Sequence, residues 1–121
     1  MISKVILVHA EFDIARGCRT LRGYAADQDW KPIIGARATA ALTALGDLIL
    51  NSGANELVPV NIAVKNYRND QGIELGCSFY SPNTTSPNIE AAKQRLQRAT
   101  DELDIYETAG NVQVTARLIV T

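Results

Sequence analysis

The stretch from Ile33 to Ser52 carries apolar residues at three- and four-residue steps, and it constrains the fold more than any other part of the chain. This spacing is typical of an amphipathic helix, and a helix of that length is roughly 30 Å long. Pro32 suits the first turn of a helix, and Gly53 suits the position just after the last turn. We therefore predict a central core helix whose buried stripe consists of Ile34, Ala38, Ala41, Leu42, Leu45, Leu48 and Ile49.

Composition favours one soluble globular domain over residues 1–121, because 46% of the residues are hydrophobic and 21% are charged. The net charge of −1 gives no basic stripe, so we do not expect nucleic acid as a partner. We find no apolar run typical of a membrane span. Cys18 and Cys77 lie far apart without a zinc-binding spacing, so we expect reduced thiols in a cytoplasmic protein.

The segments on either side of the central helix predict the rest of the fold. Asp13 is expected to cap a helix that ends near Ala26. Strands are expected at Ile2–Ala10, Glu56–Tyr67 and Ile73–Tyr80, a third helix from Pro87 to about Leu103, and a closing hairpin formed by Asp104–Thr108 and Val112–Val120. This order predicts an α+β two-layer sandwich. Its mixed, mainly antiparallel sheet has about five strands, with three helices on one face.

Arg16, Arg19 and Arg22 recur on one side of the predicted first helix. Two interpretations stay open for them, a solvated helix face or a patch that binds an acidic partner. On the central helix, Thr43 and Asp47 are four residues apart and point nearly opposite the apolar stripe. This polar face is therefore the first place to look for functional residues.

Three stretches resemble the GHKL (Bergerat-fold, histidine-kinase-like) ATPase superfamily, most closely its branch of anti-sigma factors and switch serine kinases. The opening helix of that branch resembles DIARGCRTLRGYAADQDW, and the helix with its N box falls at TAALTALGDLILNSG. The strand that ends in the family's Asp-x-Gly-x-Gly box resembles QGIELGCSFYSPN. The tail of the chain resembles the family's last helix and hairpin, so the likeness in layout covers nearly the whole sequence.

The resemblance implies a nucleotide site with degenerate motifs. Thr43 stands where the family has a glutamate, and a threonine cannot act as a general base near neutral pH. Asp47 replaces the magnesium-binding asparagine and could still bind the metal. Phe79 replaces the aspartate that reads adenine, a loss of about 1.5–3 kcal/mol of binding free energy. The vestigial site implied by the resemblance consists of Thr43, Asp47, Asn51, Phe79, Ser81 and Asn83.

By resemblance, we expect a non-catalytic regulatory protein of the anti-sigma-factor type that binds a sigma factor or an anti-sigma antagonist and uses no cofactor. Family members often form dimers, so a homodimer also stays open. Two alternatives remain. One is an active serine-protein kinase that uses ATP and magnesium, with Asp47 as the metal ligand. The other is a small α/β interaction or assembly subunit unrelated to ATP.

Overall fold

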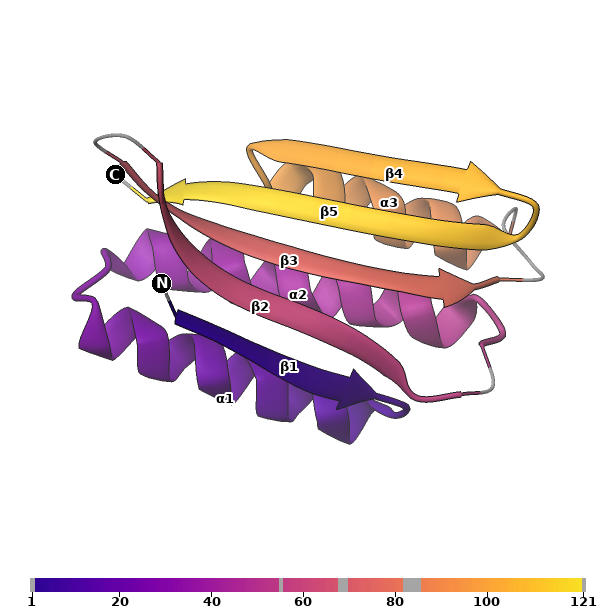
Figure 1. The fold of residues 1–121 in the computed structure, drawn as a ribbon, viewed down its shortest axis with the longest axis horizontal. Coiled ribbons are helices and arrows are strands. Elements are labelled where there is room, and N and C mark those ends of the chain that lie inside the picture. The colour runs from indigo at the N-terminus through magenta and orange to yellow at the C-terminus, as the bar shows by residue number, and fades with distance from the viewer. Residues whose placement is uncertain (1, 55, 68–69, 82–85, 121) are drawn as a thin grey trace.

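The computed structural model of the protein describes residues 2–54, 56–67, 70–81 and 86–120. Five strands form one sheet in the order β1-β2-β3-β5-β4, and every neighbouring pair is antiparallel. Three helices cover one face of this sheet, and no helix of the described residues lies over the other face (Figure 1). The predicted two-layer sandwich is confirmed, with a fully antiparallel sheet. The elements are β1 (Ile2–Val8), α1 (Glu11–Asp27), α2 (Pro32–Asn51), β2 (Val58–Tyr67), β3 (Asp70–Tyr80), α3 (Pro87–Ala99), β4 (Glu102–Thr108) and β5 (Asn111–Val120).

The predicted central helix is α2, which lies between α1 and α3 in the helical layer (Figure 1). All seven residues of its predicted stripe are buried and join the core against the sheet. Gly53 has a φ of 82°, the left-handed conformation that favours glycine after a helix. Among the described helices, α2 is long and apolar enough to cross a membrane, with a mean hydropathy of 1.5. In this fold it is a core helix, half buried by its neighbours.

The start of α1 corrects the prediction that Asp13 caps it. The helix begins at Glu11, so Asp13 lies in its first turn. Asp13 Oδ2 accepts hydrogen bonds from the backbone N–H groups of His9, at 2.9 Å, and Ala10, at 3.0 Å. These bonds lower the pKa of Asp13 and hold the chain where β1 turns into α1. The carboxylate therefore stabilises the start of the helix from inside it.

The end of α3 is also corrected, because the helix stops at Ala99 and not near Leu103. The Thr100 hydroxyl donates to the carbonyl oxygen of Leu96 at 3.0 Å, and β4 then begins at Glu102. Leu103 pairs with Ala116 of β5 and is partly buried there. Leu103 therefore belongs to a strand because it pairs with β5, although its spacing also fitted the preceding helix. The predicted inner face of α3 is confirmed, since Ile89, Ala92, Leu96 and Ala99 are all buried.

The two hairpins lie where the sequence placed them, although β3 begins earlier. Residues 70–72, expected in a turn, belong to β3, and residues 68–69 of that turn are outside the described part. The closing hairpin turns at Ala109 and Gly110, with φ values of 51° and 85°. In β2, alternate residues face the helices as predicted, and Val58, Val60, Ile62 and Val64 are buried.

Asp101 ties the helical layer to the sheet. Its Oδ2 accepts from the backbone N–H of Ile119 at 2.7 Å, and its Oδ1 accepts from Arg37 Nη2 at 3.2 Å. The bond from Ile119, followed by the one from Arg37, lowers the pKa of Asp101 below its ordinary value near 3.8. A carboxylate whose pKa is lowered by folding stabilises the fold above that ordinary value. This stabilisation is lost as the pH falls through the lowered pKa.

We expect Asp101→Asn to lower the free energy of unfolding by about 1 kcal/mol at pH 7, a modest value because the carboxylate is partly exposed. The difference from the unaltered protein should shrink as the pH falls below about 4. Urea unfolding at a series of pH values measures it. Asp70→Asn, an exposed carboxylate at the start of β3, is the control. An Asp101→Asn difference that stays constant down to acid pH would contradict the assignment.

Candidate functional site

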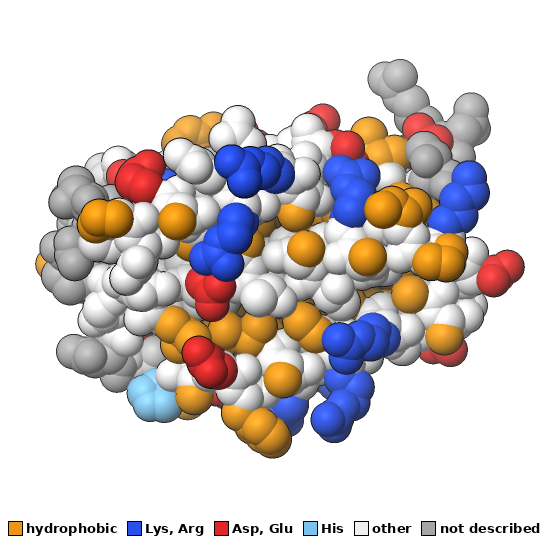
Figure 2. Space-filling model, turned by 180° about the vertical axis from the view of Figure 1, so that it is seen from behind, with side chains coloured by type: hydrophobic (Ala, Val, Ile, Leu, Met, Phe, Trp, Pro, Cys, Tyr) orange, Lys and Arg blue, Asp and Glu red, His pale blue; other side chains and the backbone are white. Residues whose placement is uncertain are grey.

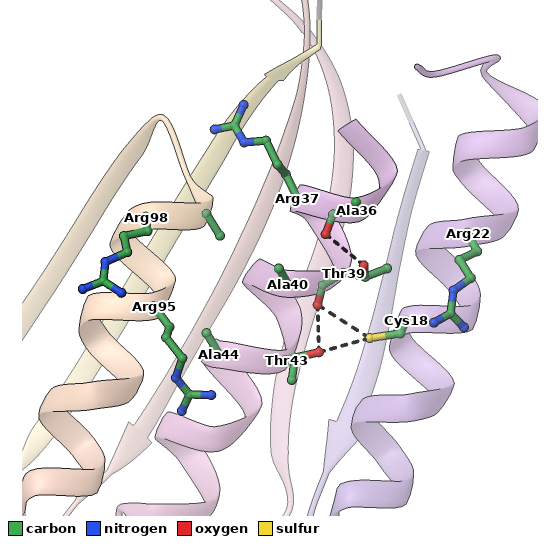
Figure 3. Close-up of a pocket in the computed structure, with 11 residues that line it drawn as sticks. Cys18, Arg22, Ala36, Arg37, Thr39, Ala40, Thr43, Ala44, Arg95 and Arg98 are labelled. Atoms are coloured by element: carbon green, nitrogen blue, oxygen red, sulfur yellow. Dashed lines mark hydrogen bonds between the residues drawn. The ribbon is translucent and has the colours of Figure 1, made fainter. Parts of the chain in front are cut away.

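A groove follows α2 along the outer face of the helical layer, between α1 and α3 (Figure 3). Its volume is about 630 Å³. Figure 2 shows this face of the molecule, with hydrophobic side chains along its middle and both basic and acidic side chains among and around them. The residues that line the groove are either small or arginine, and none is a carboxylate: Cys18, Arg22, Ala36, Arg37, Thr39, Ala40, Thr43, Ala44, Arg95, Arg98 and Ala99.

The floor of the groove is the exposed side of α2. Ala36, Ala40 and Thr43 follow one another by about one helical turn, and all three are exposed. The Thr43 hydroxyl donates to the carbonyl oxygen of Thr39 at 2.8 Å, and the Cys18 sulfur lies 3.6 Å from the Thr43 oxygen (Figure 3). The polar atoms of the floor therefore bond to the protein itself, and the floor presents mainly methyl groups to solvent.

Four arginines surround this floor. Figure 3 shows Arg22 on α1 at one side of α2, and Arg95 and Arg98 on α3 at the other. Arg37 pairs with Asp101 at 3.2 Å, and Arg95 pairs with Asp47 at 3.0 Å. Arg22 and Arg98 form no ion pair with any residue that the structure describes. The two unpaired guanidinium groups leave the groove positively charged, although the net charge of the whole chain is −1.

Asp47 and Asn51 lie on the C-terminal half of α2. The Asp47 side chain is 29% exposed, and its Oδ2 accepts from Arg95 Nη1 of α3. Asn51 Nδ2 donates to the backbone oxygen of Asp47 at 2.8 Å. Asp47 and Thr43 also line a smaller groove of about 330 Å³ between α1 and α2. Both face away from the buried stripe, as the sequence predicted.

Phe79 and Ser81 lie at the end of β3 and point into the molecule. Phe79 is 7% exposed and belongs to the hydrophobic core. Ser81 is 3% exposed, and its hydroxyl donates to the backbone oxygen of Ser52 at 3.1 Å. Ser52 follows the last residue of α2, so this bond joins the end of α2 to the end of β3. Asn83 lies outside the described residues.

The described part of the chain contains no group of three or more His, Cys, Asp or Glu side chains placed to hold a metal ion. Burial raises the pKa of the Cys77 thiol to about 12, so this thiol stays protonated at neutral pH. Thiolates, not thiols, act as nucleophiles and metal ligands. Cys77 is therefore a core residue, and Cys18 is the cysteine that lines the groove.

The predicted arginine face of α1 is divided between two surfaces. Arg22 lines the groove along α2, whereas Arg16 and Arg19 line a separate hollow of about 550 Å³ beside β1. Sequence reasoning did not single out Arg37, Arg95 or Arg98. The sequence did contain one indication, because Arg95 and Arg98 are three residues apart and so lie on the same side of α3. Nothing in the sequence indicated that this side of α3 and Arg22 lie across the same helix.

Comparison with known proteins gives a match in structure but none in sequence. No protein-family model matches the chain, and no curated protein matches it. A chain in the crystal structure of the SiaB-SiaC complex from Pseudomonas aeruginosa is similar, with a TM-score of 0.58. The likeness is one of fold. The two chains are 13% identical in sequence, and the match covers 99% of this chain and 90% of that one.

Proposed function

We propose that this chain is a non-catalytic regulatory protein of the anti-sigma-factor type that acts by binding a protein partner. The observation that carries the proposal is the groove along α2, which offers arginines and methyl groups but no histidine or carboxylate among its lining residues. Such a lining can hold a partner but supplies no general base. The fold supports the same role, because the similar chain was solved in a complex named for two proteins.

Two contacts support a role without nucleotide. The Arg95 guanidinium lies 3.0 Å from Oδ2 of Asp47, the carboxylate that the resemblance makes a possible magnesium ligand. A guanidinium at this distance repels a metal ion and so weakens its binding to the same carboxylate. By the resemblance, Phe79 takes the position of the adenine-reading carboxylate, and this buried ring can accept no hydrogen bond from a base. Both observations support a function that uses no Mg-ATP.

A thermal unfolding experiment with Mg-ATP tests the proposal. A ligand at 100 times its dissociation constant raises the free energy of unfolding by about 2.7 kcal/mol, which shifts the melting temperature by several degrees. We expect no shift, either for the unaltered protein or for Arg95→Ala, in which Asp47 is released from its ion pair. A clear upward shift of the unaltered protein would end the non-catalytic proposal.

The two alternatives give different results. The serine-kinase alternative predicts transfer of labelled phosphate from ATP to a partner protein, and loss of that transfer in Asp47→Ala. The assembly-subunit alternative predicts a molecular mass that rises with protein concentration, with no regulatory partner and no effect of nucleotide. Phosphate transfer and light-scattering measurements therefore separate the three functions.

A further inference from the structure

We propose that the groove along α2 is a docking site for an acidic amphipathic helix of a protein partner. This inference rests on the proposed function and names both the surface and the chemistry of what binds it. The groove lies on the outer face of the helical layer and takes residues from all three helices, with its α2 residues between Ala36 and Ala44. Figure 3 shows that the groove residues come from α1, α2 and α3. A partner bound there would therefore contact all three helices.

The outer side of α2 is unusually apolar for a solvent-facing helix surface. Arg37 and Asp47 are the only charged residues of its sequence, and both are held in ion pairs. Ile33, at the start of the same side, is 62% exposed. Half of the residues in the most apolar part of α2 are buried by the fold, whereas Ile33, Ala36, Ala40 and Thr43 are exposed to solvent. Exposed apolar surface with polar residues at its margin is typical of an interaction site.

The shape of the floor favours a helix as the occupant. Ala36, Ala40 and Thr43 form a straight line along α2, and small side chains let a second backbone approach closely. α1 and α3 lie on either side of this line (Figure 3), an arrangement found in grooves that receive amphipathic helices. Every lining residue other than the arginines is alanine, threonine or cysteine, so the contact surface consists mainly of small side chains.

The charge of the margin favours an acidic occupant. Arg22 stands on one side of the floor and Arg98 on the other (Figure 3). Neither forms one of the ion pairs found among the described residues. A helix lying along α2 could place carboxylates on both of its flanks against these two guanidinium groups. Arginine is well suited to such contacts, because its planar fork binds carboxylates through two parallel hydrogen bonds.

The test uses the full chain and a synthetic peptide of about 21 residues, three heptads long. Each heptad carries leucine and alanine at the two inward positions, glutamate at the two flanking positions and glutamine elsewhere. We expect ¹⁵N–¹H NMR spectra recorded during a titration to show shifts concentrated on the backbone amides of Ala36, Ala40 and Thr43. Two peptide controls are needed, one with glutamine in place of every glutamate and one with prolines that prevent the helix.

Charge-reversal variants of the protein identify the contacts. Arg22→Glu and Arg98→Glu are each expected to raise the dissociation constant about three- to tenfold, because each removes an attraction and adds a repulsion. Arg19→Glu is the matched control, since it lies on α1 but lines the hollow beside β1. It should change the constant by less than about twofold. Melting temperatures of all three variants confirm that they remain folded.

Several outcomes would overturn the inference. They are no shift with millimolar peptide, shifts confined to the sheet or to β1, and equal binding of the neutral peptide or of the proline peptide. Equal weakening by Arg19→Glu would mean that the overall charge of α1, and not the groove, attracts the peptide. None of these outcomes bears on the nucleotide experiment, so the docking site can fail while the proposed function stands.

Discussion

Replacing Leu45 with alanine is expected to lower the free energy of unfolding by about 2–5 kcal/mol. Leu45 is 0% exposed and lies in the middle of α2, where the core cluster joins the helices to the sheet. The substitution removes buried apolar surface and leaves a cavity, because the packed neighbours relax only partly into the space. Urea unfolding monitored by circular dichroism measures the change.

Leu57→Ala is the control for this experiment. Leu57 is 54% exposed, so its truncation should change the free energy of unfolding by no more than about 0.5 kcal/mol. If Leu45→Ala lowered the free energy of unfolding by less than about 1 kcal/mol, Leu45 would not be packed as tightly as a core residue. Such a result would contradict the central place of α2 in the fold.

Gly46→Ala is expected to destabilise the protein by about 1–3 kcal/mol, although alanine favours a helix more than glycine does. Gly46 is buried in α2 where α1 crosses, and an added Cβ would overlap the side chain of Ile14. The overlap involves both the Cγ1 and the Cδ1 atoms of a β-branched residue, so a rotation of its end cannot relieve it. The two helices would have to move apart.

Gly23→Ala is the matched control, because Gly23 also lies inside a helix but has nothing within 4 Å of an added Cβ. This variant should become more stable by about 0.5–1 kcal/mol, the gain expected from replacing glycine in a helix. The two substitutions thus have opposite expected signs. A stabilising Gly46→Ala would show that α1 and α2 are packed less closely than the structure places them.

Local sequence patterns were sufficient for most of the secondary structure. The apolar stripe from Ile34 to Ile49 and the alternation from Val58 to Val64 identify one face of a helix and one face of a strand. Element ends were predicted less well. Leu103 satisfied the spacing of α3 but pairs with Ala116 in β4, and Asp13 lies inside α1. Such ends depend on contacts with distant residues, which a local pattern does not contain.

The candidate site was also predictable from the sequence only in part. The sequence alone determined that Thr43 and Asp47 leave the buried stripe and that Arg22 is available on α1. Only the tertiary structure decided that Arg95 pairs with Asp47 and that Arg98 and Arg22 lie on opposite sides of the same floor. Helical periodicity is a property of neighbouring residues, so it can be read from sequence. A groove shared by three helices is set by how those helices pack on the sheet, and packing joins residues that the sequence keeps far apart.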